Sequence, residues 1–100
     1  MKPIALVTGA TSGLGAAAAT ALAQANFRVL IAGRDAARGA EVVAQIAARG
    51  GEAEFLAADL FTKHGILALA EQVKGRTKTL AVLVNNAGGS FQARQSTEDQ

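Results

Sequence analysis

Short apolar runs alternate along the chain with longer segments that have the apolar spacing of a helix. The apolar runs predict strands at residues 4–7, 27–32, 53–58 and 80–84, and the longer segments predict helices at residues 16–25, 35–48 and 62–74. The runs at residues 29–32 and 81–84 do not alternate with polar residues, which is typical of parallel strands covered by helices on both faces. Because crossovers between parallel strands are right-handed, we expect an α/β fold with a doubly wound parallel sheet and the strand order 3-2-1-4.

Three glycines, Gly9, Gly13 and Gly15, lie between the first predicted strand and the helix at residues 16–25. Glycine lets a backbone turn sharply and approach a ligand closely, and the N-terminus of a helix attracts anions. This order is typical of a loop that binds the pyrophosphate of a dinucleotide, although glycines also mark ordinary turns. We expect Gly9 to form the exit from the strand and Gly13 to admit the pyrophosphate. Gly15 either packs the helix against the sheet or contacts the ligand.

Arg34 follows the second predicted strand, where dinucleotide folds usually have an acid that binds the ribose 2′-hydroxyl. An arginine at this place favours a 2′-phosphate, so the sequence predicts NADP(H) in preference to NAD. The alternative is a solvated arginine just before a helix. Asp35 is either the ribose acid or the N-cap of the helix that begins at Ala36, and capping is favoured because helical periodicity starts directly after it.

Composition adds few constraints. The chain has 100 residues, half of them hydrophobic, which suits a single domain over residues 1–100. It is shorter than most doubly wound domains and stops soon after a segment near residues 96–98 that reads as the start of a helix, so we expect it to be truncated. It has no cysteine, which excludes disulfides and thiolate metal sites and fits a reducing compartment; we predict a cytoplasmic protein without a metal site.

Other partner classes are disfavoured by the pattern of charge and hydropathy. The apolar run at residues 4–7 is too short for a signal peptide or a membrane span. The net charge of +2 comes from scattered lysines and arginines, and the chain has neither tyrosine nor tryptophan. A nucleic-acid surface needs clustered basic residues, often with aromatic residues between them. We therefore expect neither nucleic acid nor a membrane as a partner.

Four motifs at the ends of the predicted strands resemble the short-chain dehydrogenase/reductase (SDR) family. They are Thr8-Gly-x-x-x-Gly-x-Gly15, Gly33-Arg-Asp35, Asp59-Leu60 and Asn85-Asn-Ala-Gly88. The resemblance extends from about Lys2 to Gly88, and it corresponds to the N-terminal half of this Rossmann-fold family. A weaker likeness to its retinol-dehydrogenase-like branch lies in residues 33–39 and 94–99.

The resemblance implies roles for the remaining residues of these motifs. Asp59 would hold the adenine amino group near the Leu60 backbone N–H, and Asn85 would tie the central strands together. The alternative for Asp59 is a turn residue. Thr11 and Ser12 would add hydroxyl donors to the glycine loop. The cofactor-binding residues expected in full are Gly9, Thr11, Ser12, Gly13, Leu14, Arg34, Asp59, Leu60, Asn86, Ala87 and Gly88.

The family that the chain resembles catalyses hydride transfer between a nicotinamide cofactor and a carbonyl or alcohol. Its members use a serine and a Tyr-x-x-x-Lys unit for this reaction. This chain has no tyrosine, so we predict no catalytic residue in it and expect a small-molecule substrate only for a longer form. His64, the one histidine, is interpreted as a surface residue. The alternatives are a non-catalytic dinucleotide-binding module and a nonfunctional truncated remnant.

The strand at residues 80–84 would lie at an open edge of the truncated sheet. Its five residues are all apolar, and none is a proline. This composition favours pairing with another chain. We therefore expect self-association.

Overall fold

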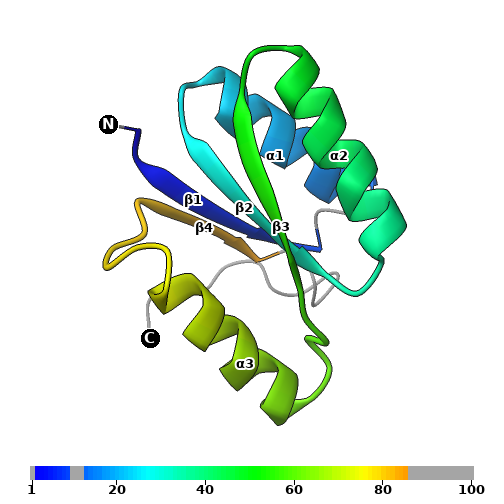
Figure 1. Cartoon of the computed structure of the whole chain (residues 1–100), viewed down its shortest axis with the longest axis vertical. Helices are drawn as coiled ribbons and strands as arrows, with labels where there is room; N and C mark the ends of the chain where they lie inside the picture. Colours follow the sequence, from blue (N-terminus) through cyan, green and yellow to red (C-terminus); the bar gives the residue numbers. More distant parts are fainter. Residues whose placement is uncertain (1, 10–12, 86–100) are drawn as a thin grey trace.

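A parallel sheet of four strands forms the centre of the fold (Figure 1). The computed structural model describes residues 2–9 and 13–85. In chain order the elements are β1 (Ile4–Thr8), α1 (Gly13–Gln24), β2 (Arg28–Gly33), α2 (Ala36–Ala48), β3 (Glu52–Ala57), α3 (Lys63–Lys74) and β4 (Val82–Asn85). The strands are arranged in the order β3-β2-β1-β4, which confirms the predicted topology.

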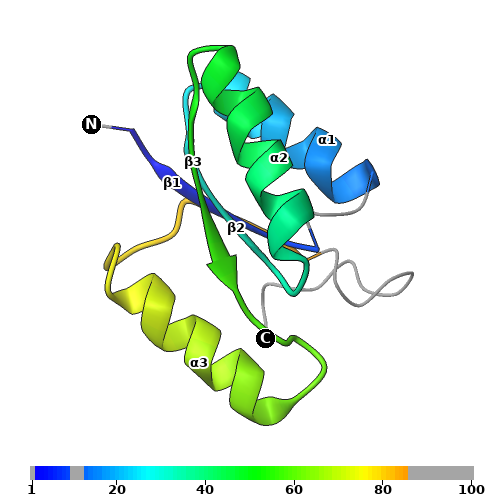
Figure 2. The same ribbon diagram turned by 45° about the vertical axis from the view of Figure 1, so that its right-hand side comes forward.

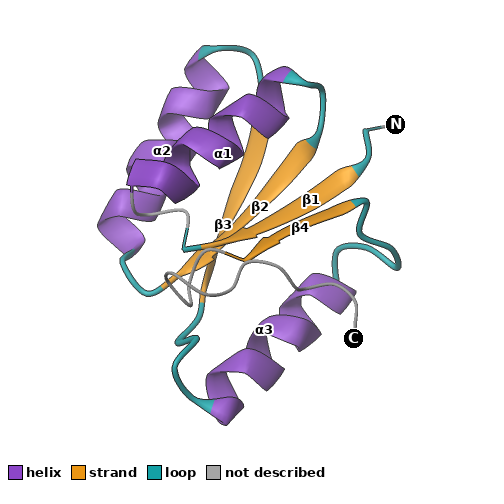
Figure 3. Cartoon of the chain, turned by 180° about the vertical axis from the view of Figure 1, so that it is seen from behind, coloured by secondary structure: helices purple, strands orange, loops and turns teal. Residues whose placement is uncertain are grey.

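Helices cover both faces of the sheet. Helices α1 and α2 lie on one face and α3 on the other, as the view turned by 45° and the view from behind show (Figures 2 and 3). Because successive side chains of a strand point to opposite faces, neighbouring residues of β1 join different cores. Val7 packs in the cluster that includes Ala19 of α1 and Ile46 of α2, whereas Leu6 packs in the cluster that includes Leu69 of α3.

Two polar side chains cap the N-termini of helices α2 and α3. The Asp35 carboxylate accepts a hydrogen bond from the Arg38 backbone N–H at 3.1 Å, which confirms that Asp35 is the N-cap of α2. The Thr62 hydroxyl oxygen accepts a hydrogen bond from the Gly65 backbone N–H at 2.9 Å and caps α3 in the same way. Each cap satisfies a backbone donor that has no partner within its helix.

The pairing register aligns the carboxyl ends of neighbouring strands. Thr8, the last residue of β1, pairs with Ala32 of β2 and with Asn85 of β4. Gly33, the last residue of β2, pairs with Ala57 at the end of β3. The loops that follow the strands therefore leave the sheet along the same edge, where ligands of open α/β sheets bind.

A group of ion pairs joins β2, β3 and the segment after α3. Arg76 Nη2 and Nε lie 2.6 Å and 2.9 Å from Glu54 Oε2, and Arg28 Nη2 lies 3.5 Å from Glu54 Oε1. The hydrogen bond from Arg76 holds the pKa of the Glu54 carboxyl below its ordinary value, and the charges of Arg76 and Arg28 act in the same direction against partial burial. The ionised form of Glu54 is therefore stabilised by the fold.

Glu54→Gln should lower the free energy of unfolding at about pH 7 and have little effect at about pH 3. The folded pKa of Glu54 is depressed, so its contribution to stability is present above the unfolded pKa and is lost as the pH falls through the folded value. Urea unfolding at the two pH values measures this difference. Glu71→Gln is the control, because the Glu71–Lys74 pair is exposed and should contribute little. Equal pH profiles for the two variants would contradict the prediction.

Candidate nucleotide-binding site

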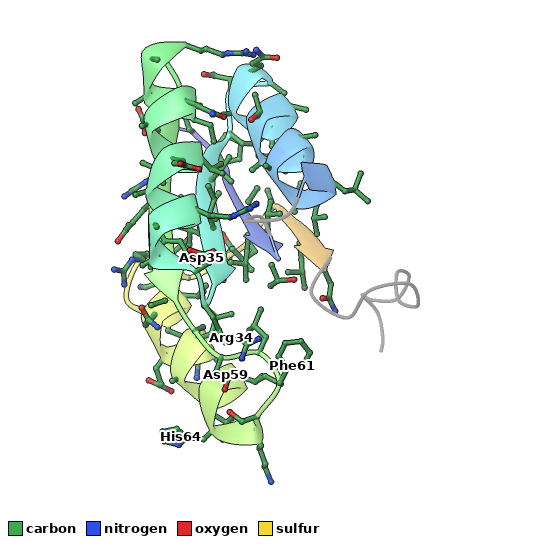
Figure 4. All side chains as sticks on the ribbon, turned by 90° about the vertical axis from the view of Figure 1, so that its right-hand side faces the viewer. Arg34, Asp35, Asp59, Phe61 and His64 are labelled. Atoms are coloured by element: carbon green, nitrogen blue, oxygen red, sulfur yellow. The ribbon has the colours of Figure 1, made fainter. Side chains whose placement is uncertain are left out.

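Three of the predicted site residues lie on loops at the carboxyl edge of the sheet. Gly9 follows β1, Arg34 follows β2 and Asp59 follows β3. Arg34 and Asp59 lie close to Phe61 (Figure 4). The structure thus brings together residues that are far apart in the sequence, as parallel pairing requires.

Gly9 makes the sharp exit from β1 that the sequence predicts. Its φ of 71° lies in the left-handed region, which residues with a Cβ rarely adopt. Its backbone N–H donates a hydrogen bond to the Ala32 carbonyl oxygen at 3.0 Å, which fixes the turn to the end of β2. A glycine is required here by the backbone conformation.

The first turn of α1 contains two glycines, Gly13 and Gly15. Among the described residues, no heavy atom would lie within 4 Å of a Cβ added at Gly13. The first turn contains no acidic residue, and the positive end of the helix dipole is therefore uncompensated by a local carboxylate. Leu14 is 74% exposed, whereas Gly15 is buried, in agreement with a packing role for Gly15.

Arg34 contacts an aromatic ring that the sequence analysis did not single out. The guanidinium carbon of Arg34 lies over the Phe61 ring at 5.0 Å from its centroid, within the range of a cation–π interaction (Figure 4). Phe61 is 74% exposed although it is a large apolar side chain. Its position directly after the Asp59-Leu60 motif is the signal in the sequence that could have identified it.

Asp59 and Leu60 shape the loop between β3 and α3. Asp59 Oδ1 accepts a hydrogen bond from the Phe61 backbone N–H at 3.0 Å, so the carboxylate stabilises a turn. The Leu60 side chain packs against the apolar cluster on the α3 face of the sheet. The adenine contacts expected of these two residues stay predictions.

Gly65 allows α3 to approach this loop. A Cβ at Gly65 would lie 1.8 Å from the Asp59 carbonyl oxygen and 3.0 Å from Thr62 Oγ1. The sequence alone marks Gly65 only as a residue that weakens its helix, because its importance depends on a contact outside that helix. The neighbouring His64 is exposed and points away from Arg34, as expected of a surface residue (Figure 4).

Asn85 joins two central strands. The Thr8 hydroxyl donates to Asn85 Oδ1 at 3.0 Å, and the Val84 carbonyl oxygen lies 3.4 Å from the same hydroxyl. This contact gives Asn85 the structural role that the sequence predicts. Five predicted cofactor-binding residues lie outside the described residues: Thr11, Ser12, Asn86, Ala87 and Gly88.

None of the helices in the part of the chain that the structure describes could span a membrane. Within residues 2–9 and 13–85, no three or more histidine, aspartate or glutamate side chains are grouped so that they could hold a metal ion.

The model of the short-chain dehydrogenase family matches residues 3–100. The chain belongs to this family. The glycine turn after β1 and Arg34 after β2 lie where the SDR resemblance implied. The strand order is also the one expected for an SDR protein.

Known proteins similar to this SDR chain include both bacterial enzymes and solved structures. It is 41% identical over 100 residues to a 3beta-hydroxysteroid dehydrogenase of Mediterraneibacter gnavus. The structure of a metagenomic short-chain oxidoreductase in complex with NADP superposes with a TM-score of 0.77 at 40% identity, over 81% of this chain. The Pseudomonas aeruginosa RhlG/NADP complex superposes with a TM-score of 0.78 at 37% identity, over 84% of this chain.

The chain spans about a third of the length of these SDR relatives. The alignment with the 3beta-hydroxysteroid dehydrogenase covers 98% of this chain and 36% of that protein. The two solved structures are covered to 37% and 34%. With 98% of this chain aligned, the part shared with the 3beta-hydroxysteroid dehydrogenase includes the glycine motif and β1 to β4.

Gly65→Ala should destabilise this SDR chain by about 1–3 kcal/mol, because the added Cβ overlaps the Asp59 backbone and forces the loop or helix to move. Urea unfolding followed by circular dichroism measures the change. Gly75→Ala is the matched control, since Gly75 has a φ of −70° and its added Cβ would be 3.5 Å from its nearest neighbour. Equal stability of the two variants would show that the contact at Gly65 imposes no constraint.

Proposed function

We propose that this chain is the N-terminal, cofactor-binding part of an NADP(H)-dependent short-chain oxidoreductase. The observation that carries the proposal is the exposed Arg34 at the carboxyl end of β2, beside a left-handed glycine turn and the open start of α1. Two similar SDR structures contain NADP, which supports the same cofactor for this chain.

The residues present fit the adenosine and pyrophosphate half of such a cofactor. Gly13 leaves room for the pyrophosphate at the N-terminus of α1, where the positive end of the helix dipole favours an anion. Arg34 would bind the 2′-phosphate with its guanidinium donors. Asp59 and Leu60 would border the adenine. Gly9 would shape the loop without contacting the ligand through a side chain.

The reaction proposed for the whole protein is hydride transfer between the nicotinamide and a small carbonyl or alcohol. The cofactor supplies the hydride, and the protein supplies the groups that move the proton. This chain has no tyrosine that could serve as the phenol of the SDR reaction. We therefore expect no turnover by the 100 residues alone. The retinol-dehydrogenase-like branch and the cytoplasmic location stay predictions.

The chain should bind NADP⁺ more tightly than NAD⁺ by about 1.5–3 kcal/mol, the contribution of a hydrogen bond to a charged group. Arg34→Ala should remove this difference, because it deletes the guanidinium and leaves the glycine loop intact. Calorimetric titration with both nucleotides is the measurement. Arg49→Ala serves as control, since Arg49 is an exposed arginine at the opposite end of α2. Equal affinities in the unmutated chain would overturn the proposed cofactor.

Self-association of the 100-residue chain is the second part of the proposal. Among the described strands, β4 pairs with β1 alone and lies at the edge of the sheet. Leu83 of β4 is 48% exposed, and an apolar groove of about 610 Å³ lies between β4 and α3, lined in part by Leu80 and Ile66. An open apolar edge favours pairing with a second copy of the chain.

Leu83→Lys should therefore shift the chain toward the monomer, because a charge on an edge strand opposes strand pairing. Leu83 is a sharper test than Val82, whose side chain is partly buried and contributes to the fold. Size-exclusion chromatography with light scattering gives the mass. Leu67→Lys is the control, since Leu67 is 57% exposed on α3 and does not line the groove. A monomeric unmutated chain at all concentrations would contradict the proposal.

A further inference from the structure

Phe61 combines high exposure with a specific contact. Its side chain is 74% exposed on the loop between β3 and α3, and its ring lies under the Arg34 guanidinium at 5.0 Å from centroid to guanidinium carbon. The two residues belong to different loops, so their contact depends on the pairing of β2 with β3. An exposed aromatic residue beside a predicted phosphate-binding arginine points to a role in binding.

The loop holds Phe61 in place from two sides. Asp59 Oδ1 accepts the hydrogen bond from the Phe61 backbone N–H, and the Leu60 side chain is anchored in the apolar cluster on the α3 face. The first turn of α3 approaches the Asp59 carbonyl so closely that Gly65 has no room for a Cβ. The ring is therefore attached to a fixed turn, although its own surface faces solvent.

The acids near Arg34 are engaged elsewhere. Asp35 Oδ1 caps α2 through the Arg38 backbone N–H, and Asp35 Oδ2 lies 3.7 Å from Arg38 Nε. Asp59 Oδ1 accepts from the Phe61 backbone. Within residues 2–9 and 13–85, Arg34 forms no salt bridge, and its recorded side-chain contact is the Phe61 ring. The Arg34 guanidinium is therefore not ion-paired with either acid in the described part of the chain.

We propose that Phe61 is a specificity-determining residue, whose ring positions the Arg34 guanidinium to receive the 2′-phosphate of NADP(H). A guanidinium that contacts a ring through its face keeps the N–H donors at its edge for a phosphate. The ring also restricts the rotamers of Arg34 before a ligand binds. Arg34 therefore loses less side-chain entropy on binding, which lowers the entropic cost of binding. This inference rests on the proposed function, because it concerns the selectivity of that same site.

The test compares two nucleotides that differ at the ribose 2′ position. Adenosine 2′,5′-bisphosphate and AMP are titrated into the unmutated chain, Phe61→Leu, Phe61→Tyr and the control Leu67→Ala, which changes an exposed apolar residue of α3. Phe61→Leu should reduce the preference for the 2′-phosphate about two- to fivefold, the size of an exposed cation–π interaction. Phe61→Tyr should retain the preference, and Leu67→Ala should not change it.

A second measurement examines the contact without any ligand. The Arg34 δ protons should have upfield NMR shifts from the Phe61 ring in the unmutated chain and lose them in Phe61→Leu. Unshifted protons in the unmutated chain would overturn the inference.

The outcomes separate this inference from the proposed function. A preference for the 2′-phosphate that disappears in Arg34→Ala and persists in Phe61→Leu would overturn the role of Phe61 and leave the cofactor assignment intact. Equal weakening of both nucleotides by Phe61→Leu would show that the ring binds adenine, and it would also overturn the inference. An unmutated chain that binds both nucleotides equally would overturn the proposed function itself.

Discussion

The burial of β1 on both faces and both edges is the constraint on which the rest of the structure depends. Ala5 and Val7 have no exposed surface, and Leu6 is 6% exposed. Such a strand satisfies its backbone by parallel pairing with β2 and β4, and its side chains require helices above and below. The register of this pairing fixes where each strand ends. The loops that carry Gly9 and Arg34 therefore start at adjacent points of one edge.

Much of the fold could be predicted because its signals are local. Short, mostly apolar segments identified the strands, and Asp35 followed by helical periodicity identified the start of α2. The boundaries of β4 could not be predicted, because they depend on its pairing with β1. The paired part of β1 begins at Ala5, which lies opposite Val82, so β4 is Val82–Asn85. Leu80 reads as strand from its composition but lies before this pairing begins and is 37% exposed.

The candidate site was predicted less completely, because its details depend on contacts between loops. The sequence pattern located Arg34 and Asp59 at strand ends, yet no periodicity reports that a guanidinium lies over the Phe61 ring. Gly65 likewise reads as a weak helical residue, whereas its need for a glycine comes from the Asp59 backbone against it. For Asp59 the sequence left a ligand contact and a turn residue as alternatives, and the hydrogen bond from the Phe61 backbone N–H shows that its carboxylate stabilises a turn.

An acid directly after Arg34 is compatible with a 2′-phosphate site because the two side chains have different contacts. An acid at the end of the second strand suits a ribose hydroxyl and would repel a 2′-phosphate. Here the Asp35 carboxylate is turned to its own helix, where the Arg38 backbone N–H and side chain compensate its charge. Arg34 instead lies over Phe61, which offers no opposing charge. The helix cap thus engages the acid that would oppose a phosphate, and within residues 2–9 and 13–85 the Arg34 guanidinium at the same edge of the sheet forms no salt bridge.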